Sequence, residues 1–109
     1  MPTTYKVLGQ SAPSATTATT LYTVPASTQA VVSTVVIANR ATTAATFRIA
    51  CRVNGASLTN SQYIAYDVTV GGGDSTALTL GITLGAADIL EIYASTANLS
   101  FTAFGSEIS

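Results

Sequence analysis

The residues of this chain that could act as acids, bases or metal ligands are five carboxylates. Histidine, the commonest general base and a frequent transition-metal ligand, is absent from the sequence. The carboxylates are Asp67, Asp74, Asp88, Glu91 and Glu107, and a glycosidase needs two of them flanking the scissile bond. Asp74 and Asp88 are predicted in turns, where aspartate bonds the local backbone, and Glu91 is predicted on the opposite strand face from Asp88. We therefore expect a protein that is not an enzyme and that holds no metal or cofactor.

Other features resemble functional motifs but lack the context that those motifs need. Gly71-Gly72-Gly73 is not followed by the Lys-Ser/Thr pair and helix of a phosphate-binding loop, and the carboxylates lack the spacing of a calcium-binding EF-hand. Cys51 is the only cysteine, so it cannot form an intrachain disulfide. Because it alternates in phase with Phe47, Ile49 and Val53, we expect a buried hydrophobic side chain rather than a reactive thiol.

The composition indicates a single domain whose surface carries little charge. The chain has 109 residues, of which 48% are hydrophobic and 8% are charged, against roughly 25% charged in an ordinary soluble protein. A net charge of −1 leaves no basic surface for nucleic acid. The longest apolar run, 30–38, is about half the length that a bilayer requires, and residues 1–10 lack the pattern of a signal peptide.

From this composition we expect no nucleic-acid binding and no membrane insertion. An apolar chain of this kind is typical of proteins whose surface is covered by copies of themselves or by a partner. The alternative is a small Ala- and Thr-rich domain that tolerates a low charge.

Arginine and tyrosine side chains are the first candidates for contact with a partner. Arg48 and Arg52 lie on the same predicted outward face of a strand, where they could dock a carboxylate patch of another subunit. A solvated strand face that resists aggregation explains them equally well. Tyr63 and Tyr93 are predicted on the outward faces of their strands, where tyrosine anchors an interface or a sugar ring, or covers the sheet.

Short segments of alternating apolar residues follow one another along the chain. They predict eight strands, at 5–8, 21–24, 30–38, 46–54, 62–70, 78–85, 89–94 and 98–104. Residues 9–20 are predicted as a loop or an extended arm. The expected fold of residues 1–109 is a single all-β domain, an antiparallel β-sandwich of about eight strands with a jelly-roll or Greek-key path.

The two strands predicted at 30–38 and 46–54 are expected to pair side by side, because only a short polar connection separates them. The second strand is apolar on one face. The first is apolar on both faces, which is typical of a strand that is covered on both sides. Val32 and Val36, on its second face, are therefore further candidates for contact with another subunit. Within 78–85, Gly81 predicts a bulge.

Seven segments spread over nearly the whole chain form a recognisable set. They are TTYKVLGQSAP, LYTVPAST, VVIANR, TFRIA, QYIAYDV, LTLGITLGAADILEIYAS and LSFTAFGSEIS. Together they resemble a family of small virion proteins of tailed bacteriophages, including cyanophages and other aquatic phages.

The resemblance implies a β-sandwich with a structural role in the virion, made in the host cytoplasm and incorporated in many copies. It offers no catalytic residues. The expected function is that of a capsid decoration, or cement, protein: a homo-oligomer such as a trimer that bridges neighbouring copies of the major capsid protein. The alternative is a tail, neck, baseplate or fibre component, whose tyrosines contact glycans of the host surface.

Overall fold

The computed structural model describes residues 2–109, and these residues form nine β-strands and two short 3-10 helices. The elements are β1 (Thr3–Ser11), β2 (Thr19–Thr23), β3 (Gln29–Asn39), β4 (Ala45–Arg52), η1 (Val53–Gly55), η2 (Asn60–Gln62), β5 (Tyr63–Val70), β6 (Ser75–Leu78), β7 (Ile82–Leu84), β8 (Ile89–Ala94) and β9 (Leu99–Ile108). Within 2–109, neither helix is of a length and hydrophobicity that would cross a bilayer.

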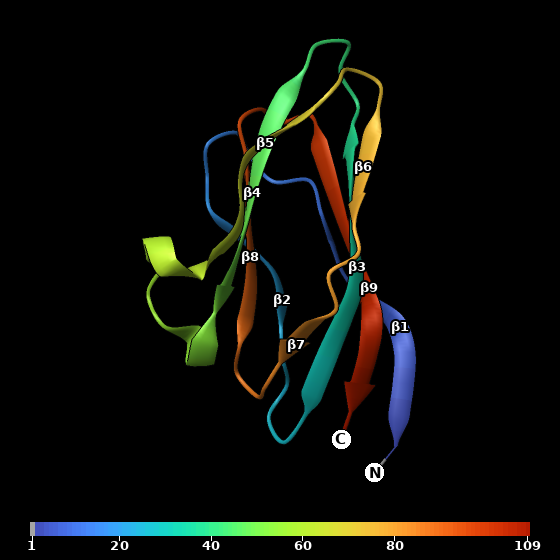
Figure 1. Cartoon of the computed structure of the whole chain (residues 1–109), viewed down its shortest axis with the longest axis vertical. Helices are drawn as coiled ribbons and strands as arrows, with labels where there is room; N and C mark the ends of the chain where they lie inside the picture. The colour runs from blue at the N-terminus through green and yellow to red at the C-terminus, as the bar shows by residue number, and fades with distance from the viewer. Residues whose placement is uncertain (1) are drawn as a thin grey trace.

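The strands form two antiparallel sheets that face each other in two layers (Figure 1). The five-stranded sheet has the order β1-β9-β3-β6, and β7 pairs with β3 on the same edge as β6. The four-stranded sheet has the order β2-β8-β4-β5. Every neighbouring pair is antiparallel, so the expected all-β sandwich is confirmed.

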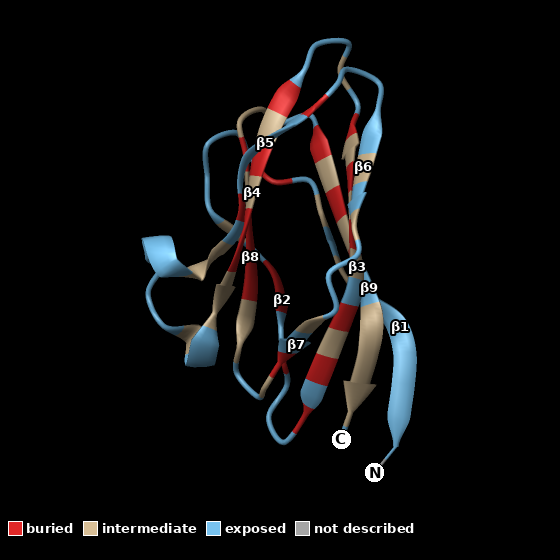
Figure 2. Cartoon of the chain, in the orientation of Figure 1, coloured by how far each residue is buried: buried red, intermediate tan, exposed pale blue. Residues whose placement is uncertain are grey.

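The hydrophobic core fills the space between the two inner faces (Figure 2). Strict alternation along β4, β8 and β9 places every second residue inside. The largest side chains that are fully buried there are Phe47, Phe101, Ile37, Ile49, Leu90, Ile92 and Leu99. Phe47 from one sheet meets Phe101 from the other edge to face, with ring centres 6.2 Å apart, a preferred geometry for aromatic pairs.

The predicted side-by-side pairing of 30–38 with 46–54 is wrong. These segments are β3 and β4, which are consecutive in the chain but belong to different sheets. Asn39, which is buried, fixes the crossing between the layers: its Nδ2 donates to the carbonyl oxygens of Thr43 and Val70, and its Oδ1 accepts from the backbone N–H of Ala41. A short polar connection therefore joins the two layers here instead of closing a hairpin.

Several predicted boundaries also move. The loop predicted at 9–20 is shorter, because 9–11 belong to β1 and 19–20 belong to β2. The single strand predicted at 78–85 is two strands, β6 and β7. Gly81, between them, has a positive φ of 63° that breaks the ladder. The eight expected strands are therefore nine in residues 2–109.

Candidate functional site

The outer face of the four-stranded sheet carries four charged side chains, which form two ion pairs. Arg48 and Arg52 project outward from β4, since Phe47 and Ile49 on the other face of that strand are buried in the core. Arg48 pairs with a carboxylate of β5, and Arg52 pairs with a carboxylate of β8. The two pairs differ in burial and in what surrounds them.

Arg48 is the centre of an aromatic cluster. Its Nε donates to Asp67 Oδ1 at 2.7 Å, and its Nη2 donates to Oδ2 at 3.4 Å. The guanidinium carbon lies 4.2 Å from the centre of the Tyr66 ring and 4.3 Å from the centre of the Tyr93 ring, within the range of cation–π attraction. Tyr63 packs edge-on against Tyr66, with ring centres 4.9 Å apart. We call these five residues the arginine–tyrosine cluster.

The cluster holds the positive charge of Arg48 in a fixed position close to the surface. Hydrogen bonding to Asp67 raises the pKa of the Arg48 guanidinium still further above its ordinary value. The Arg48 side chain is only 23% exposed, whereas the Asp67 side chain is 46% exposed and Tyr66 is 56% exposed. The cluster therefore offers a partner one carboxylate and an exposed phenol ring, above an arginine that its neighbours already hold in place.

Two register shifts in β5 bring this cluster together. Between Ile49 and Ala50 the extra residue Ile64 turns Tyr66 to the same face as Tyr63, and between Phe47 and Ile49 both Tyr66 and Asp67 lie opposite Arg48. Asp67 has a positive φ of 53° at this point, as bulged residues can. Strict alternation would place Tyr66 on the opposite face from Tyr63. The sequence pattern therefore does not predict Tyr66 as a member of the site, whereas it places Asp67 on the same face as Tyr63 without pairing it with Arg48. The sequence holds no signal for either shift.

Arg52 is occupied by contacts within the chain. Its Nη1 donates to Glu91 Oε1 at 2.6 Å, its Nε to the carbonyl oxygen of Ala56 at 2.7 Å, and its Nη2 to the carbonyl oxygen of Gly55 at 3.1 Å. Glu91 itself is buried. Arg52 thus neutralises a buried carboxylate and holds the chain after β4 against the sheet, which makes it a structural residue.

The sequence pattern predicts Val32 on an outward face, and this prediction is wrong. Val32 lies in the core, where it is 0% exposed. The reason is a bulge in β3, whose pairing with β9 shifts between Val32 and Thr34. The extra residue, Ser33, reverses the phase of the strand, so that Val32 and Val35 both point inward. Val36 does lie on the outer face, half-buried beside β9.

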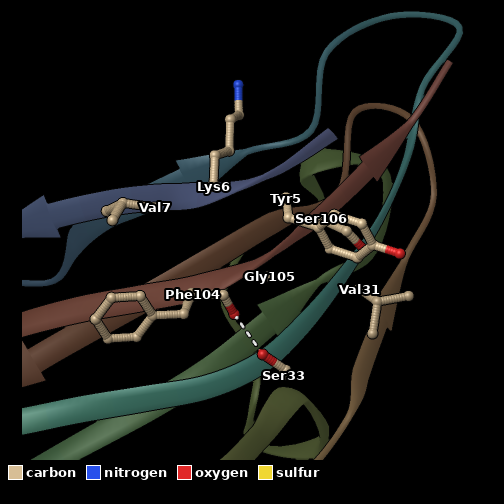
Figure 3. Close-up of a pocket in the computed structure, with 8 residues that line it drawn as sticks. All are labelled: Tyr5, Lys6, Val7, Val31, Ser33, Phe104, Gly105 and Ser106. Atoms are coloured by element: carbon tan, nitrogen blue, oxygen red, sulfur yellow. Dashed lines mark hydrogen bonds between the residues drawn. The ribbon is translucent and has the colours of Figure 1, made fainter. Parts of the chain in front are cut away.

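The outer face of the five-stranded sheet is hollowed between β1, β9 and β3 (Figure 3). The side chains of Tyr5, Val7 and Phe104 stand around the hollow, and Val31 and Ser33 border it from β3. Ser33 Oγ donates to the carbonyl oxygen of Phe104 at 3.1 Å, which ties the bulged residue to the neighbouring strand. This surface was not predicted from the sequence, apart from Val36 farther along β3.

Two of the carboxylates serve the turns in which they lie. Asp88 accepts from the backbone N–H of Asn54 at 2.7 Å and from that of Gly85 at 2.8 Å. Asp74 accepts from the backbone N–H of Ser75 at 2.8 Å. No group of three or more side chains that could ligate a metal occurs within residues 2–109.

Glu107 lies on the inner face of β9, near the end of the sandwich. Its Oε1 is 2.9 Å from Lys6 Nζ, and its Oε2 accepts a hydrogen bond from the Tyr22 hydroxyl, which reaches across from the other sheet. These bonds lower the pKa of the Glu107 carboxyl, the bond from Tyr22 contributing most. Burial, and the bond to Glu107, raise the pKa of Tyr22 above its ordinary value. The three side chains form a polar link between the layers.

Cys51 is half-buried on β4 and packs against the core. Burial raises the pKa of its thiol, and the negative charge of Asp88 adds to the shift. A thiol of this kind is a poor nucleophile at neutral pH.

Comparison of the chain with protein-family models and with curated proteins finds no match. The function is therefore argued from the two outer faces of the sandwich and from the segments that resemble phage virion proteins.

Proposed function

We propose that this chain is a non-enzymatic structural protein of a phage virion, a capsid decoration protein that docks on the shell through the arginine–tyrosine cluster. The observation that supports this docking surface is the exposure of Tyr66 and Asp67 beside Arg48 on the outer face of the four-stranded sheet. Tyrosine and arginine are among the residue types enriched at the positions that contribute most binding energy at protein interfaces. The resemblance of the sequence to virion proteins supplies the kind of partner, the major capsid protein.

The geometry of the cluster favours binding at a low entropic cost. The Arg48 side chain is held by Asp67 and by two aromatic rings before any partner arrives, so little rotamer freedom remains to be lost. Many such contacts, repeated over a shell, stabilise it without strong binding at any single copy. The low charge of the chain, 8% of its residues, suits a surface that is covered on the particle.

The test of location is the copy number of the chain in purified particles, measured by quantitative mass spectrometry. A decoration protein is expected in hundreds of copies per particle. Six or twelve copies would contradict the assignment to the head and favour the second candidate, a tail or baseplate component. The observation that favours this second candidate is Tyr66, whose exposed ring is suited to stacking on a sugar.

The test of the docking surface is the binding of Tyr66→Ala to capsids from which the decoration layer has been stripped. Tyr66→Ala is expected to bind less tightly than the wild type. Thr69→Ala, an exposed position farther along β5, is the matched control and is expected to bind as the wild type does. Equal binding of both variants would show that the cluster is not the docking surface.

A further inference from the structure

The outer face of the five-stranded sheet carries no charged residue in the rows that cross β1, β9 and β3. Because paired residues of neighbouring strands lie on the same face, the register defines these rows. They are Tyr5, Ser106 and Val31; Val7, Phe104 and Thr34; and Gln10, Thr102 and Val36. A fourth row, Ser100 and Ala38, continues the pattern. By contrast, the outer face of the four-stranded sheet carries both of the arginine ion pairs.

The uncharged face also exposes large apolar side chains. Tyr5 is 82% exposed, Val7 is 47% exposed and Phe104 is 40% exposed, and they stand around the hollow shown in Figure 3. Lys6 also lines this hollow with a side chain that is 47% exposed, but it lies in the inward phase of β1, opposite Gly105, and its ammonium group pairs with Glu107 at 2.9 Å. Exposed apolar side chains grouped on one face mark a surface that is covered by a partner.

We propose that this face binds the same face of a second copy of the chain, in a pair related by a two-fold axis. A surface without charge is complementary to another surface without charge, since a charged partner group would lose its hydration there without gaining a counter-ion. The other sheet's outer face, with its four charges, does not meet this condition. A patch that contacts the same patch of a second copy produces a closed two-fold pair. In this pair the Tyr5 and Phe104 rings of one copy enter the hollow of the other.

The size of the molecule is sufficient for such a pair. The face spans β1, β9, β3 and the edge strands β6 and β7, and β9 is ten residues long, so strand spacings of about 4.8 Å and a rise of about 3.4 Å per residue give a flat area of roughly 650 Å². The relief of the side chains adds accessible surface to this flat area. Stable interfaces bury about 800 Å² on each partner. The pairing leaves the arginine–tyrosine cluster, on the opposite side of the sandwich, free to contact something else.

The experiment is the molar mass of the purified chain in solution, measured by light scattering over a range of micromolar concentrations. The wild type is expected to have the mass of two 11.0 kDa chains. Tyr5→Glu places a charge on the uncharged face at a side chain exposed enough to leave the fold intact, and it is expected to be a monomer. Tyr66→Glu, an exposed tyrosine of the other sheet, is the matched control and is expected to remain a dimer. Circular dichroism verifies that both variants are folded.

Three results would overturn the proposal. The first is a monomeric wild type over the whole concentration range, which would leave the face for a different protein. The second is a dimer that persists in Tyr5→Glu or that is lost in Tyr66→Glu. The third is a trimer or a larger assembly. None of these results depends on a virion, so the proposed decoration role stands or fails separately.

Discussion

Strand β9 offers a sharp comparison, because it carries two phenylalanines with opposite surroundings. Phe101 is 1% exposed and meets Phe47 across the sandwich, whereas Phe104 points outward and is 40% exposed. Phe101→Ala leaves a cavity between the sheets, and its expected cost is about 3–5 kcal/mol of unfolding free energy. Phe104→Ala leaves no cavity, and its expected cost is about 1 kcal/mol from the partial burial that is lost.

Urea denaturation followed by circular dichroism measures both costs, at a protein concentration low enough to keep the chain monomeric. With a slope of roughly 1.5 kcal/mol per molar urea for a chain of this size, the midpoint should fall by about 2–3 M for Phe101→Ala and by less than about 1 M for Phe104→Ala. Phe101→Leu, which keeps most of the volume, should cost less than about 1.5 kcal/mol. Equal midpoints for the two alanine variants, or a larger loss at Phe104, would refute the assignment of inner and outer faces to β9.

Three further predictions follow from contacts inside the sandwich. Arg52→Ala leaves the buried carboxylate of Glu91 without its partner and should lower the unfolding free energy by about 1–3 kcal/mol; an unchanged urea midpoint would contradict the structural role. Gly105→Ala drives a methyl group into a backbone carbonyl of β3 and should cost about 2–3 kcal/mol; thermal melting measures it, and a wild-type melting temperature would contradict the close approach. The pKa of Glu107 is lowered in the fold, so its contribution to the unfolding free energy is complete above the ordinary carboxyl pKa and is lost as pH falls through the folded pKa. The urea midpoint should therefore fall more between neutral and acidic pH for the wild type than for Glu107→Gln. Parallel curves for the two proteins would contradict this prediction.

Much of the fold can be predicted from the period-two pattern of the sequence. The inward position of Phe47, Ile49 and Phe101 follows from strict alternation. β4 and β9, which carry these residues, have no inserted residue of their own next to them. The sandwich class follows from the number of such strands and from the turns between them.

Bulges limit that prediction, because one extra residue reverses the face of everything that follows. Ser33 moves Val32 into the core, and the extra residue Ile64 in β5 moves Tyr66 onto the outer face beside Arg48. Nothing in the local residue types distinguishes these positions from regular strand. The arginine–tyrosine cluster could therefore be predicted only in part, from Arg48, Tyr63 and Tyr93.

Strand partners limit the prediction as well. Two apolar strands joined by a short connection can pack side by side in one sheet or face to face across a sandwich. In the structure the crossing from β3 to β4 is held by the hydrogen bonds of Asn39. One of these bonds is made to the carbonyl oxygen of Val70, far along the chain, so it cannot be predicted from the local sequence.

The pairing of the first strand with the last sets a condition on how this chain folds. Thr3 lies opposite Ile108, and the β1–β9 ladder continues to Ser11 opposite Phe101 (Figure 1). Forming that ladder closes a loop of nearly the whole sequence, which is entropically costly, and folds rich in such distant contacts form slowly. A circular permutant that joins the two ends with a short linker would turn this ladder into a hairpin. The pairing that spans the greatest sequence separation among residues 2–109 would then be a local one.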